Sequence, residues 1–263
     1  MILRPRCNIS AFGVYTLVEH KTGKDVNEAL QFEFAACSHV GRRENNEDSY
    51  GTHTGEGSFA AVVADGVGGH ERGEEASRLA VNHILTEISS CDADEDLLLD
   101  AITGASLAIG QGESHGFTTV TALWISQAEA IAAHVGDSRI YQFRGGKILY
   151  QSLDHSDVMM GVLAGELPPH ATRTHPARNR IFRALGLPGE VPKVDSRVLD
   201  VRPGDRFLLC SDGFWEPVWE EDMLGTMAQT LTAEEWLDRM RVLVEALDDP
   251  IQDNYTAVAI IVK

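Results

Sequence analysis

Two short apolar runs that each lead into an Asp-Gly pair constrain both the fold and the place of a site. Residues 59–64 (Phe-Ala-Ala-Val-Val-Ala) are continuously apolar and are followed directly by Asp65-Gly66. Residues 207–210 (Phe-Leu-Leu-Cys) are followed, after one serine, by Asp212-Gly213. Uninterrupted runs of this length are typical of buried strands. A buried strand that stops at an aspartate places the carboxylate at a sheet edge, where binding residues are often found.

The chain from residue 31 onward predicts strands and helices in alternating blocks rather than repeated βαβ units. Ala76, Ala80 and Ile84 follow a helical stripe. Thr232 and Glu235 form a capping box that opens a helix near the C-terminus. The other predicted elements are a helix over residues 94–109 and strands over residues 32–37, 119–125, 130–135, 139–143, 147–150 and 257–262. This order favours the α+β class and one domain over residues 31–263.

Residues 1–30 carry no clear motif and are interpreted as an N-terminal extension, either an added strand or a loose leader. They lack the continuous apolar segment of a secretory signal. No stretch approaches the roughly 18 uninterrupted apolar residues that a membrane span requires. The four cysteines include no Cys-x-x-Cys pair and are too few for a disulfide framework. We therefore expect a cytoplasmic protein with no membrane partner.

The charge balance is strongly acidic, with 22 Lys and Arg against 40 Asp and Glu and a formal net charge of −18. Such a field repels polyanions, which argues against nucleic acid and anionic membranes as partners. An acidic surplus has two explanations. One is solubility, and the other is a cation site that gathers several carboxylates. Composition does not choose between them.

Four acidic pairs share one property, which is that each lies directly beside a predicted strand. Any one of them alone is a common turn dipeptide. Four together suggest carboxylates that converge from distant parts of the chain, and such a cluster needs cations to offset its repulsion. Oxygen ligands favour Mg²⁺ or Mn²⁺, and two such ions can activate a water for phosphoryl transfer. The pairs are Glu47-Asp48, Asp65-Gly66, Asp212-Gly213 and Asp253-Asn254.

Five short motifs in a fixed order carry a more specific signal. Together they resemble the metal-dependent protein phosphatase family (PPM, the type 2C serine/threonine phosphatases) in its compact bacterial form, over roughly residues 32–262. The resemblance implies a four-layer αββα sandwich of two antiparallel β-sheets flanked by helix pairs, with a dinuclear metal site at one end. The motifs are Arg-Glu-Asn-Asn-Glu-Asp (43–48), Asp-Gly-Val-Gly-Gly-His (65–70), Gly-Asp-Ser-Arg (136–139), Ser-Asp-Gly (211–213) and Asp-Asn (253–254).

The resemblance also implies metal-binding roles for particular residues. Asp65 is expected to bridge two divalent cations, Mn²⁺ or Mg²⁺, and the carbonyl of Gly66 to help hold one of them. Glu47 is expected to reach the second cation directly or through water. Asp212 and Asp253 are expected to ligate the first cation. A water or hydroxide that bridges the two cations is then the nucleophile.

Two further roles follow from the same resemblance. Asp48 is expected to orient the waters of the first cation, and Arg43 to grip the phosphate through paired charge-assisted bonds. Asp65, Asp212 and Arg43 would then carry catalysis. Asp137 to Arg139 and Asp154 to Ser156 are interpreted as structural.

The chain departs from the family pattern at three places. Val67 stands where animal-type members carry a histidine, so water or another group, with His70 as a candidate, supplies the leaving-group proton. The aspartate that holds a third metal in many members aligns near Ser114, with Glu113 one residue out of step, so a third metal site is doubtful. Residues 156–185, which we call the flap segment, correspond to the family's variable region beside the site.

The function we predict is metal-dependent hydrolysis of phosphoserine and phosphothreonine in proteins, by a monomer that opposes a Ser/Thr kinase. Two alternatives stay open. One is a pseudophosphatase that keeps the fold and acts as a binding module. The other is a phosphatase of small phosphorylated metabolites, which would need a deep pocket lined by fixed polar groups.

Overall fold

The computed structural model describes residues 30–67, 72–111, 116–247 and 251–263. All but the last residue of the N-terminal extension lies outside these ranges. His70, Glu113 and Ser114 also lie outside them, so the predictions that concern these three residues stay untested.

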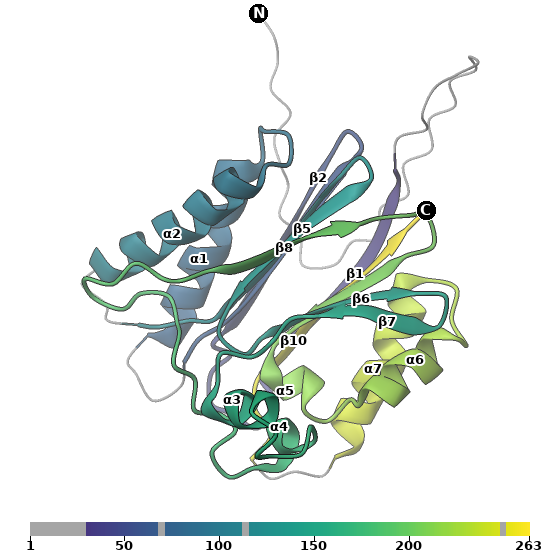
Figure 1. Ribbon diagram of the computed structural model, residues 1–263. Coiled ribbons are helices and arrows are strands. Elements are labelled where there is room, and N and C mark those ends of the chain that lie inside the picture. The colour runs from purple at the N-terminus through teal and green to yellow at the C-terminus, as the bar shows by residue number, and fades with distance from the viewer. Residues whose placement is uncertain (1–29, 68–71, 112–115, 248–250) are drawn as a thin grey trace, which may run out of the picture.

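Two antiparallel sheets of five strands form the centre of the molecule (Figure 1). In one sheet the strands run in the order β1 (Phe32–His39), β10 (Tyr255–Val262), β9 (Arg206–Cys210), β6 (Arg139–Arg144) and β7 (Lys147–Gln151). In the other the order is β2 (Asp48–Gly55), β3 (Ser58–Asp65), β4 (Val120–Ser126), β5 (Glu129–Val135) and β8 (Asp195–Asp200). The first sheet therefore combines the two ends of the described chain with its middle.

Helices cover the outer faces of both sheets, which makes four layers (Figure 1). On the sheet that contains β3 these are α1 (Gly73–Ile88) and α2 (Glu95–Gln111), and on the other sheet α6 (Glu220–Met227) and α7 (Ala233–Ala246). At one end of the sandwich lie α3 (Asp157–Leu163), α4 (Ala171–Thr174) and α5 (Asp212–Trp215). The predicted αββα sandwich is confirmed. None of the described helices is long and apolar enough to cross a membrane.

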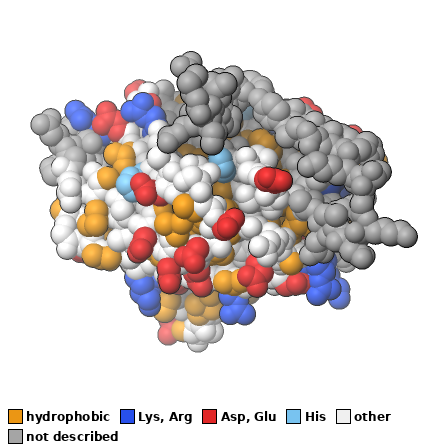
Figure 2. Space-filling view, turned by 90° about the horizontal axis from the view of Figure 1, so that it is seen from above, with side chains coloured by type: hydrophobic (Ala, Val, Ile, Leu, Met, Phe, Trp, Pro, Cys, Tyr) orange, Lys and Arg blue, Asp and Glu red, His pale blue; other side chains and the backbone are white. Residues whose placement is uncertain are grey.

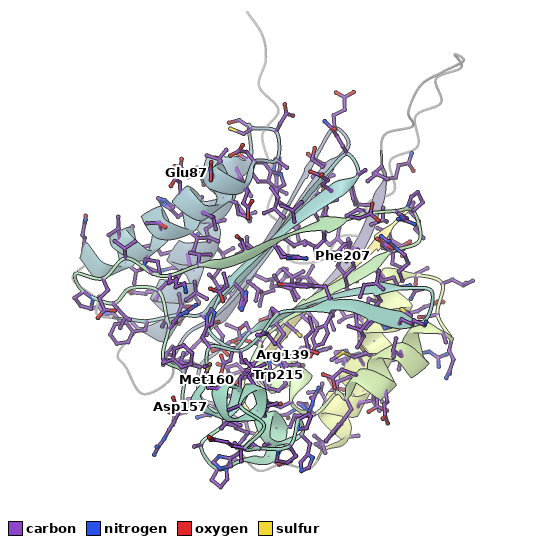
Figure 3. The ribbon with its side chains drawn as sticks, viewed as in Figure 1. Glu87, Arg139, Asp157, Met160, Phe207 and Trp215 are labelled. Atoms are coloured by element: carbon purple, nitrogen blue, oxygen red, sulfur yellow. The ribbon has the colours of Figure 1, made fainter. Side chains whose placement is uncertain are left out.

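Three apolar cores hold these layers together. Phe59, Phe207 and Ile260 are fully buried between the two sheets, and Figure 3 shows Phe207 in that position. A second core joins α1 and α2 to their sheet, and a third joins α5, α6 and α7 to the other. In the third core the rings of Phe143 and Trp236 meet edge to face, with centroids 5.3 Å apart. Aromatic pairs prefer such an arrangement.

The strands predicted from apolar runs are all present, whereas β2 and β8 were missed. The sequence of β2 has no apolar alternation, yet every one of its residues pairs with β3. Gly51 of β2 also lets α1 approach closely, because a Cβ there would lie 2.6 Å from Leu85 and 2.8 Å from Val81. The pairing and packing of β2 therefore come from its neighbours and not from its own pattern.

The capping box is confirmed at the start of α7. The Thr232 hydroxyl accepts a hydrogen bond from the Glu235 amide at 3.1 Å. The Glu235 carboxylate in turn accepts one from the Leu231 amide at 3.1 Å. The short helices α3 to α6 were not predicted, since they are too brief to show a periodic stripe.

Part of the acidic surplus lies on the surface. The face in Figure 2 carries acidic side chains across its middle and basic ones mainly toward its rim. The rest includes carboxylates that are wholly or partly buried at the end of the sandwich where α5 lies. These form the site described next.

Candidate metal centre

The ends of β2 and β3 bring two of the predicted acids together. Asp48 opens β2 and pairs in register with Asp65, which closes β3. The backbone of Asp65 is held by the start of β4, because its carbonyl accepts hydrogen bonds from the Thr119 amide and the Thr118 hydroxyl, both at 2.8 Å. The Thr119 hydroxyl accepts a hydrogen bond from the Asp65 amide at 3.1 Å. Asp65 is thus fixed at the sheet edge that the sequence predicted.

Asp48 connects this edge to the second Asp-Gly segment. Its side chain is buried, and one carboxylate oxygen accepts a hydrogen bond from the Ser211 hydroxyl at 2.8 Å. Its other oxygen has no partner within the described residues. Burial raises the pKa of Asp48 to about 7, and the nearby charges of Asp212 and Asp253 add to the effect. A buried carboxylate oxygen without a donor is costly for the fold.

Glu47 and Gly66 lie where the two segments meet the start of α1. The Gly66 amide donates to the Glu47 carbonyl at 3.1 Å, and the Glu47 amide donates to the Asn254 side chain at 2.8 Å. Only glycine fits at position 66, because a Cβ would lie 2.5 Å from the backbone of Gly73. Burial and then Asp253 raise the pKa of Glu47. The close backbone approach leaves the Glu47 carboxyl against Gly73 at the N-terminus of α1, an end that favours negative charge.

Asp212 and Asp253 approach from the other sheet. Asp212 begins α5 directly after β9. Gly213 packs so closely on the carbonyl of Asn254 that no side chain fits there. Asn254 also donates to the carbonyls of Val40 and Asn45, at 2.8 and 2.9 Å. These contacts fix the last acidic pair beside the segment that carries Arg43.

The acids repel one another across this centre. Burial is the largest cause that raises the pKa of Asp65, and the charges of Asp48 and Asp212 follow. Burial and then Asp253 also raise the pKa of Asp212. Each carboxylate therefore makes its neighbours harder to ionise, which is the electrostatic pattern of a cation site.

Asp137 also belongs to the acids with a raised pKa in this centre, although the sequence predicted a structural role for it. Its carboxyl is buried, and burial followed by the charge of Asp212 raises its pKa well above the ordinary value. Its carbonyl accepts the Trp215 indole N–H at 2.9 Å, so it has a structural contact as well. Nothing in the Gly-Asp-Ser-Arg motif separates these two roles, because the charge effect depends on β6 lying beside β9.

Arg43 lies at the rim of the centre, with 53% of its side chain exposed. It forms an ion pair with Asp253 at 2.7 Å, and this hydrogen bond raises its pKa. Arg43 therefore contacts one of the predicted metal ligands. Its role in phosphate binding stays a prediction.

His155, by contrast, lies in the scaffold. Its ring stacks on His134 at 4.7 Å, Nδ1 accepts the Gly136 amide at 3.0 Å, and Nε2 lies 3.2 Å from Asp195. Burial, with a smaller contribution from His134, lowers the pKa of His155 to about 4. These contacts hold the residue that precedes the flap segment against β5 and β8.

The donor set fits divalent cations. It consists of carboxylates and one backbone carbonyl, which are the oxygen ligands that Mg²⁺ and Mn²⁺ prefer. Within the described ranges, no three His, Cys, Asp or Glu side chains are grouped closely enough to hold one ion as they stand. The fit therefore rests on the unpartnered Asp48 oxygen and on the mutual repulsion of the acids.

Comparisons with known proteins agree with these observations. A family model described as Protein phosphatase 2C matches residues 37–250. The serine/threonine protein phosphatase PstP of Mycobacterium tuberculosis is 36% identical over 242 residues, which cover 87% of this chain but only 45% of PstP. The serine/threonine phosphatase stp of Listeria monocytogenes is 32% identical over 209 residues, which cover 74% of this chain and 82% of stp.

The fold agrees as well. A crystal structure of the PstP catalytic domain in complex with two manganese ions superposes with a TM-score of 0.74 at 31% identity. The match covers 89% of this chain and 99% of that one.

Proposed function

This chain belongs to the protein phosphatase 2C family, and from that premise we propose that it is a metal-dependent phosphatase of phosphoserine and phosphothreonine in proteins. The observation that carries the proposal is the acidic centre. Carboxylates from both sheets meet at one end of the sandwich, and burial together with their mutual repulsion raises the pKa of Asp65 and Asp212. A fold that maintains such repulsion is well suited to bind cations there.

The residues that would hold two divalent cations are Asp65, the carbonyl of Gly66, Glu47, Asp212 and Asp253. Mn²⁺ is the first choice, because the similar PstP catalytic domain was crystallised with two manganese ions. When bound, such cations supply a water that is nucleophilic near neutral pH and stabilise the charge of the transferring phosphoryl group. Asp48 would orient water through its unpartnered oxygen, and its hydrogen bond from Ser211 supports this proposal.

Arg43 would bind the phosphate of the substrate. Its side chain is more than half exposed, and its partner Asp253 is itself a proposed ligand. A phosphate can replace that partner, since a guanidinium forms paired bonds with phosphate oxygens as readily as with a carboxylate. The expected substrates are phosphorylated proteins that a Ser/Thr kinase produces. A cytoplasmic location and a monomeric state stay predictions from the sequence.

The test is hydrolysis of a phosphothreonine peptide with Mn²⁺, with Mg²⁺ and with EDTA. Asp212→Asn removes one ligand charge at nearly constant shape, and Asp100→Asn, on the exposed side of α2, is the matched control. We expect turnover only with metal, loss of at least about 100-fold in Asp212→Asn, within the range that removal of one key catalytic interaction costs, and full activity in the control.

The alternatives give different results. Metal binding without hydrolysis of either the peptide or small phosphate esters would indicate a binding module. Hydrolysis of small esters alone would indicate a metabolite phosphatase.

A further inference from the structure

The helix that begins at Asp212 is a single turn, so its position depends on its surroundings. α5 closes on itself through the Glu216 amide, which donates to the Asp212 carbonyl at 2.9 Å. The Trp215 amide donates to the carbonyl of Ser211 at 3.1 Å. One isolated turn is unstable in water. Contacts from outside must therefore hold it.

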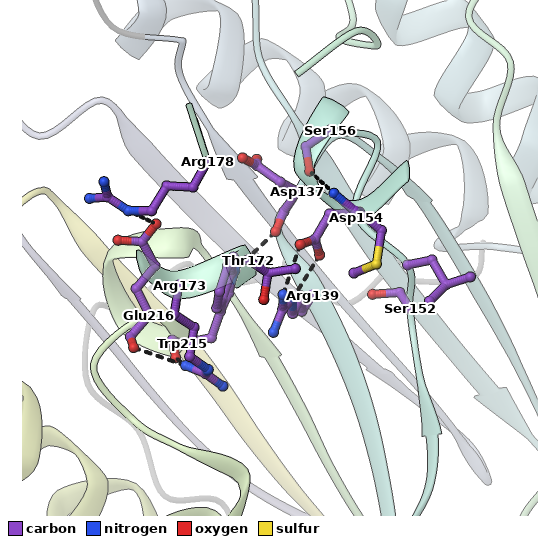
Figure 4. Close-up of polar contacts among 12 residues, drawn as sticks. Asp137, Arg139, Ser152, Asp154, Ser156, Thr172, Arg173, Arg178, Trp215 and Glu216 are labelled. Carbon is purple, nitrogen blue, oxygen red and sulfur yellow. Dashed lines mark hydrogen bonds and ion pairs between the residues drawn. The ribbon is translucent and has the colours of Figure 1, made fainter. Parts of the chain in front are cut away.

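The flap segment supplies these contacts through Arg173 of α4. Arg173 is buried, with only 8% of the residue exposed. One guanidinium nitrogen donates to the carbonyls of Trp215 and Glu216, the latter at 2.9 Å, and another donates to Glu220 at 2.7 Å. Figure 4 shows Arg173 against Trp215 and Glu216. The last carbonyls of a helix lack partners within it, and a cation satisfies them.

The Trp215 side chain fixes the same turn from a second direction. The guanidinium groups of Arg139 and Arg173 lie over this ring, at 3.4 and 5.2 Å from its centroid. Figure 3 shows Trp215 beside Arg139, at the end of the sheet. Its indole N–H donates to the carbonyl of Asp137. On its other side, α5 packs through Gly213 on Asn254. α5 is therefore wedged between the flap segment and the Asp253-Asn254 pair.

We propose that Arg173 is a positioning residue that clamps α5 and thereby sets the placement of Asp212 relative to Asp253. The inference rests on the proposed function, since it assigns the two aspartates to one metal site. Arg173 touches neither carboxylate. It acts through the backbone at the far end of the turn, so it is expected to influence metal affinity more than the chemistry of the reaction.

The chain offers a matched control in Arg206. Its guanidinium donates to the Thr230 carbonyl at 2.7 Å and lies 5.5 Å from the Trp236 ring. It thus makes the same kinds of contact as Arg173 on the same side of the first sheet. Arg206 begins β9, however, while Asp212 follows the other end of that strand. A substitution at Arg206 disturbs a similar clamp away from the acidic centre.

The experiment is calorimetric titration of Mn²⁺ into the full chain, for wild type, Arg173→Lys and Arg206→Lys. Thermal melts by circular dichroism show whether each variant is folded. Lysine keeps the charge but loses the fork that reaches the two carbonyls through one nitrogen and Glu220 through another. We expect Arg173→Lys to raise the Kd for Mn²⁺ about tenfold, the lower end of what losing the support around a metal ligand costs. Arg206→Lys should leave the Kd unchanged at a similar loss of Tm.

Equal shifts in the two variants, or an unchanged Kd in Arg173→Lys, overturn the clamp. If Arg173→Lys does not fold, Glu220→Gln tests the same contact, and it should raise the Kd by a smaller factor. An unchanged Kd in that variant overturns the clamp as well. If wild-type protein binds no Mn²⁺, the proposed function fails together with the clamp. If wild type binds Mn²⁺ but the two variants behave alike, only the clamp fails. The two failures are therefore distinguishable.

Discussion

Two charged regions lie at the same end of the sandwich, and they treat charge in opposite ways. In the acidic centre around Asp65 and Asp212, burial raises the pKa of the carboxylates and their mutual repulsion raises it further. In the neighbouring arginine cluster, Arg139 binds Asp154 through two hydrogen bonds of 2.7 Å, and Arg173 binds Glu220. Figure 4 shows the paired Arg139 and Asp154. One region is left electrostatically unsatisfied, and the other is fully compensated.

The difference separates a binding role from a structural one. A buried pair with good geometry holds its elements in place and gains nothing from a ligand. A group of buried like charges gains strongly from a cation, because the ion removes the repulsion that the fold maintains. Asp137 touches both regions, since its carboxyl is affected by Asp212 and its carbonyl accepts from Trp215. Substitutions in the two regions should therefore have different signs and different readouts.

The largest expected effect comes from breaking the compensated pair. Arg139→Met would leave Asp154 buried without its partner, so we expect the free energy of unfolding to fall by about 3–5 kcal/mol. Urea denaturation monitored by circular dichroism measures it. The double variant Arg139→Met/Asp154→Leu should recover much of the loss, because an apolar pair of similar volume replaces a buried ion pair at little cost. A double variant as unstable as the single one would contradict the assignment.

The next largest expected effect is also on the free energy of unfolding, and it concerns His155 in the scaffold. Its pKa of about 4 lies below the ordinary 6.5, so the unfolded chain binds more protons between these values. The stability that neutral His155 contributes is complete above about pH 6.5 and is lost as the pH falls through 4. His134, Arg183, Asp195 and Asp154 are the charged and titratable groups that act on it or on its stacked neighbour.

We therefore expect the difference in free energy of unfolding between wild type and His155→Gln to shrink by about 2 kcal/mol between about pH 7.5 and pH 5. Urea titrations at both pH values measure it. The exposed His170→Gln serves as the control and should show no such change. A difference that stays constant with pH would show that His155 is not held neutral by the fold.

How far the sequence predicts these regions depends on how local each cause is. Asp65 and Asp212 were found because each follows an apolar strand, a pattern that a few adjacent residues carry. β2 was missed because its pairing with β3 and its contact with α1 are not visible in its own residues. The same reason hid the effect of the Asp212 charge on the pKa of Asp137, because β6 and β9 become neighbours only in the folded sheet.

The flap segment shows the same limit from the other side. The resemblance marked it as the variable region beside the site, but no pattern predicted that Arg173 reaches the end of α5. Arginines in a loop are ordinarily solvated, so only the tertiary contact reveals this one as buried. The ion pair of Arg43 with Asp253 likewise joins residues 210 positions apart. Long-range polar contacts are therefore what the structure adds to the sequence.

Arg43 contacts a proposed metal ligand, because its guanidinium forms an ion pair with Asp253. Arg43→Ala should raise KM for a phosphothreonine peptide about tenfold, which is the lower end of what a hydrogen bond to a charged group contributes. It should not weaken Mn²⁺ binding, since Arg43 competes with a cation for Asp253. Steady-state kinetics and calorimetry measure the two quantities. The neighbouring exposed Arg42→Ala is the control, and equal effects from both would point to a general loss of positive charge.

The smallest effect is the most direct comparison of the two regions, because the same substitution is made in each. At about pH 8, where Asp48 is mostly ionised, Asp48→Asn in EDTA should raise the free energy of unfolding by at least about 1 kcal/mol, because burial and the neighbouring acids raise the pKa of Asp48 from 3.8 to about 7, which is more than one pKa unit. The asparagine amide keeps an oxygen that accepts the hydrogen bond from Ser211. The substitution also removes one negative charge from a cluster of carboxylates that repel one another. Asp154→Asn should instead lower the free energy of unfolding by at least about 3 kcal/mol, since Arg139 then loses a buried charged partner.

In saturating Mn²⁺ the stability gained from Asp48→Asn should disappear, because the cation has already removed the repulsion. If Asp48→Asn destabilises the protein in EDTA as Asp154→Asn does, then the acidic centre is a compensated structural network like its neighbour, and the case for a cation site fails with it.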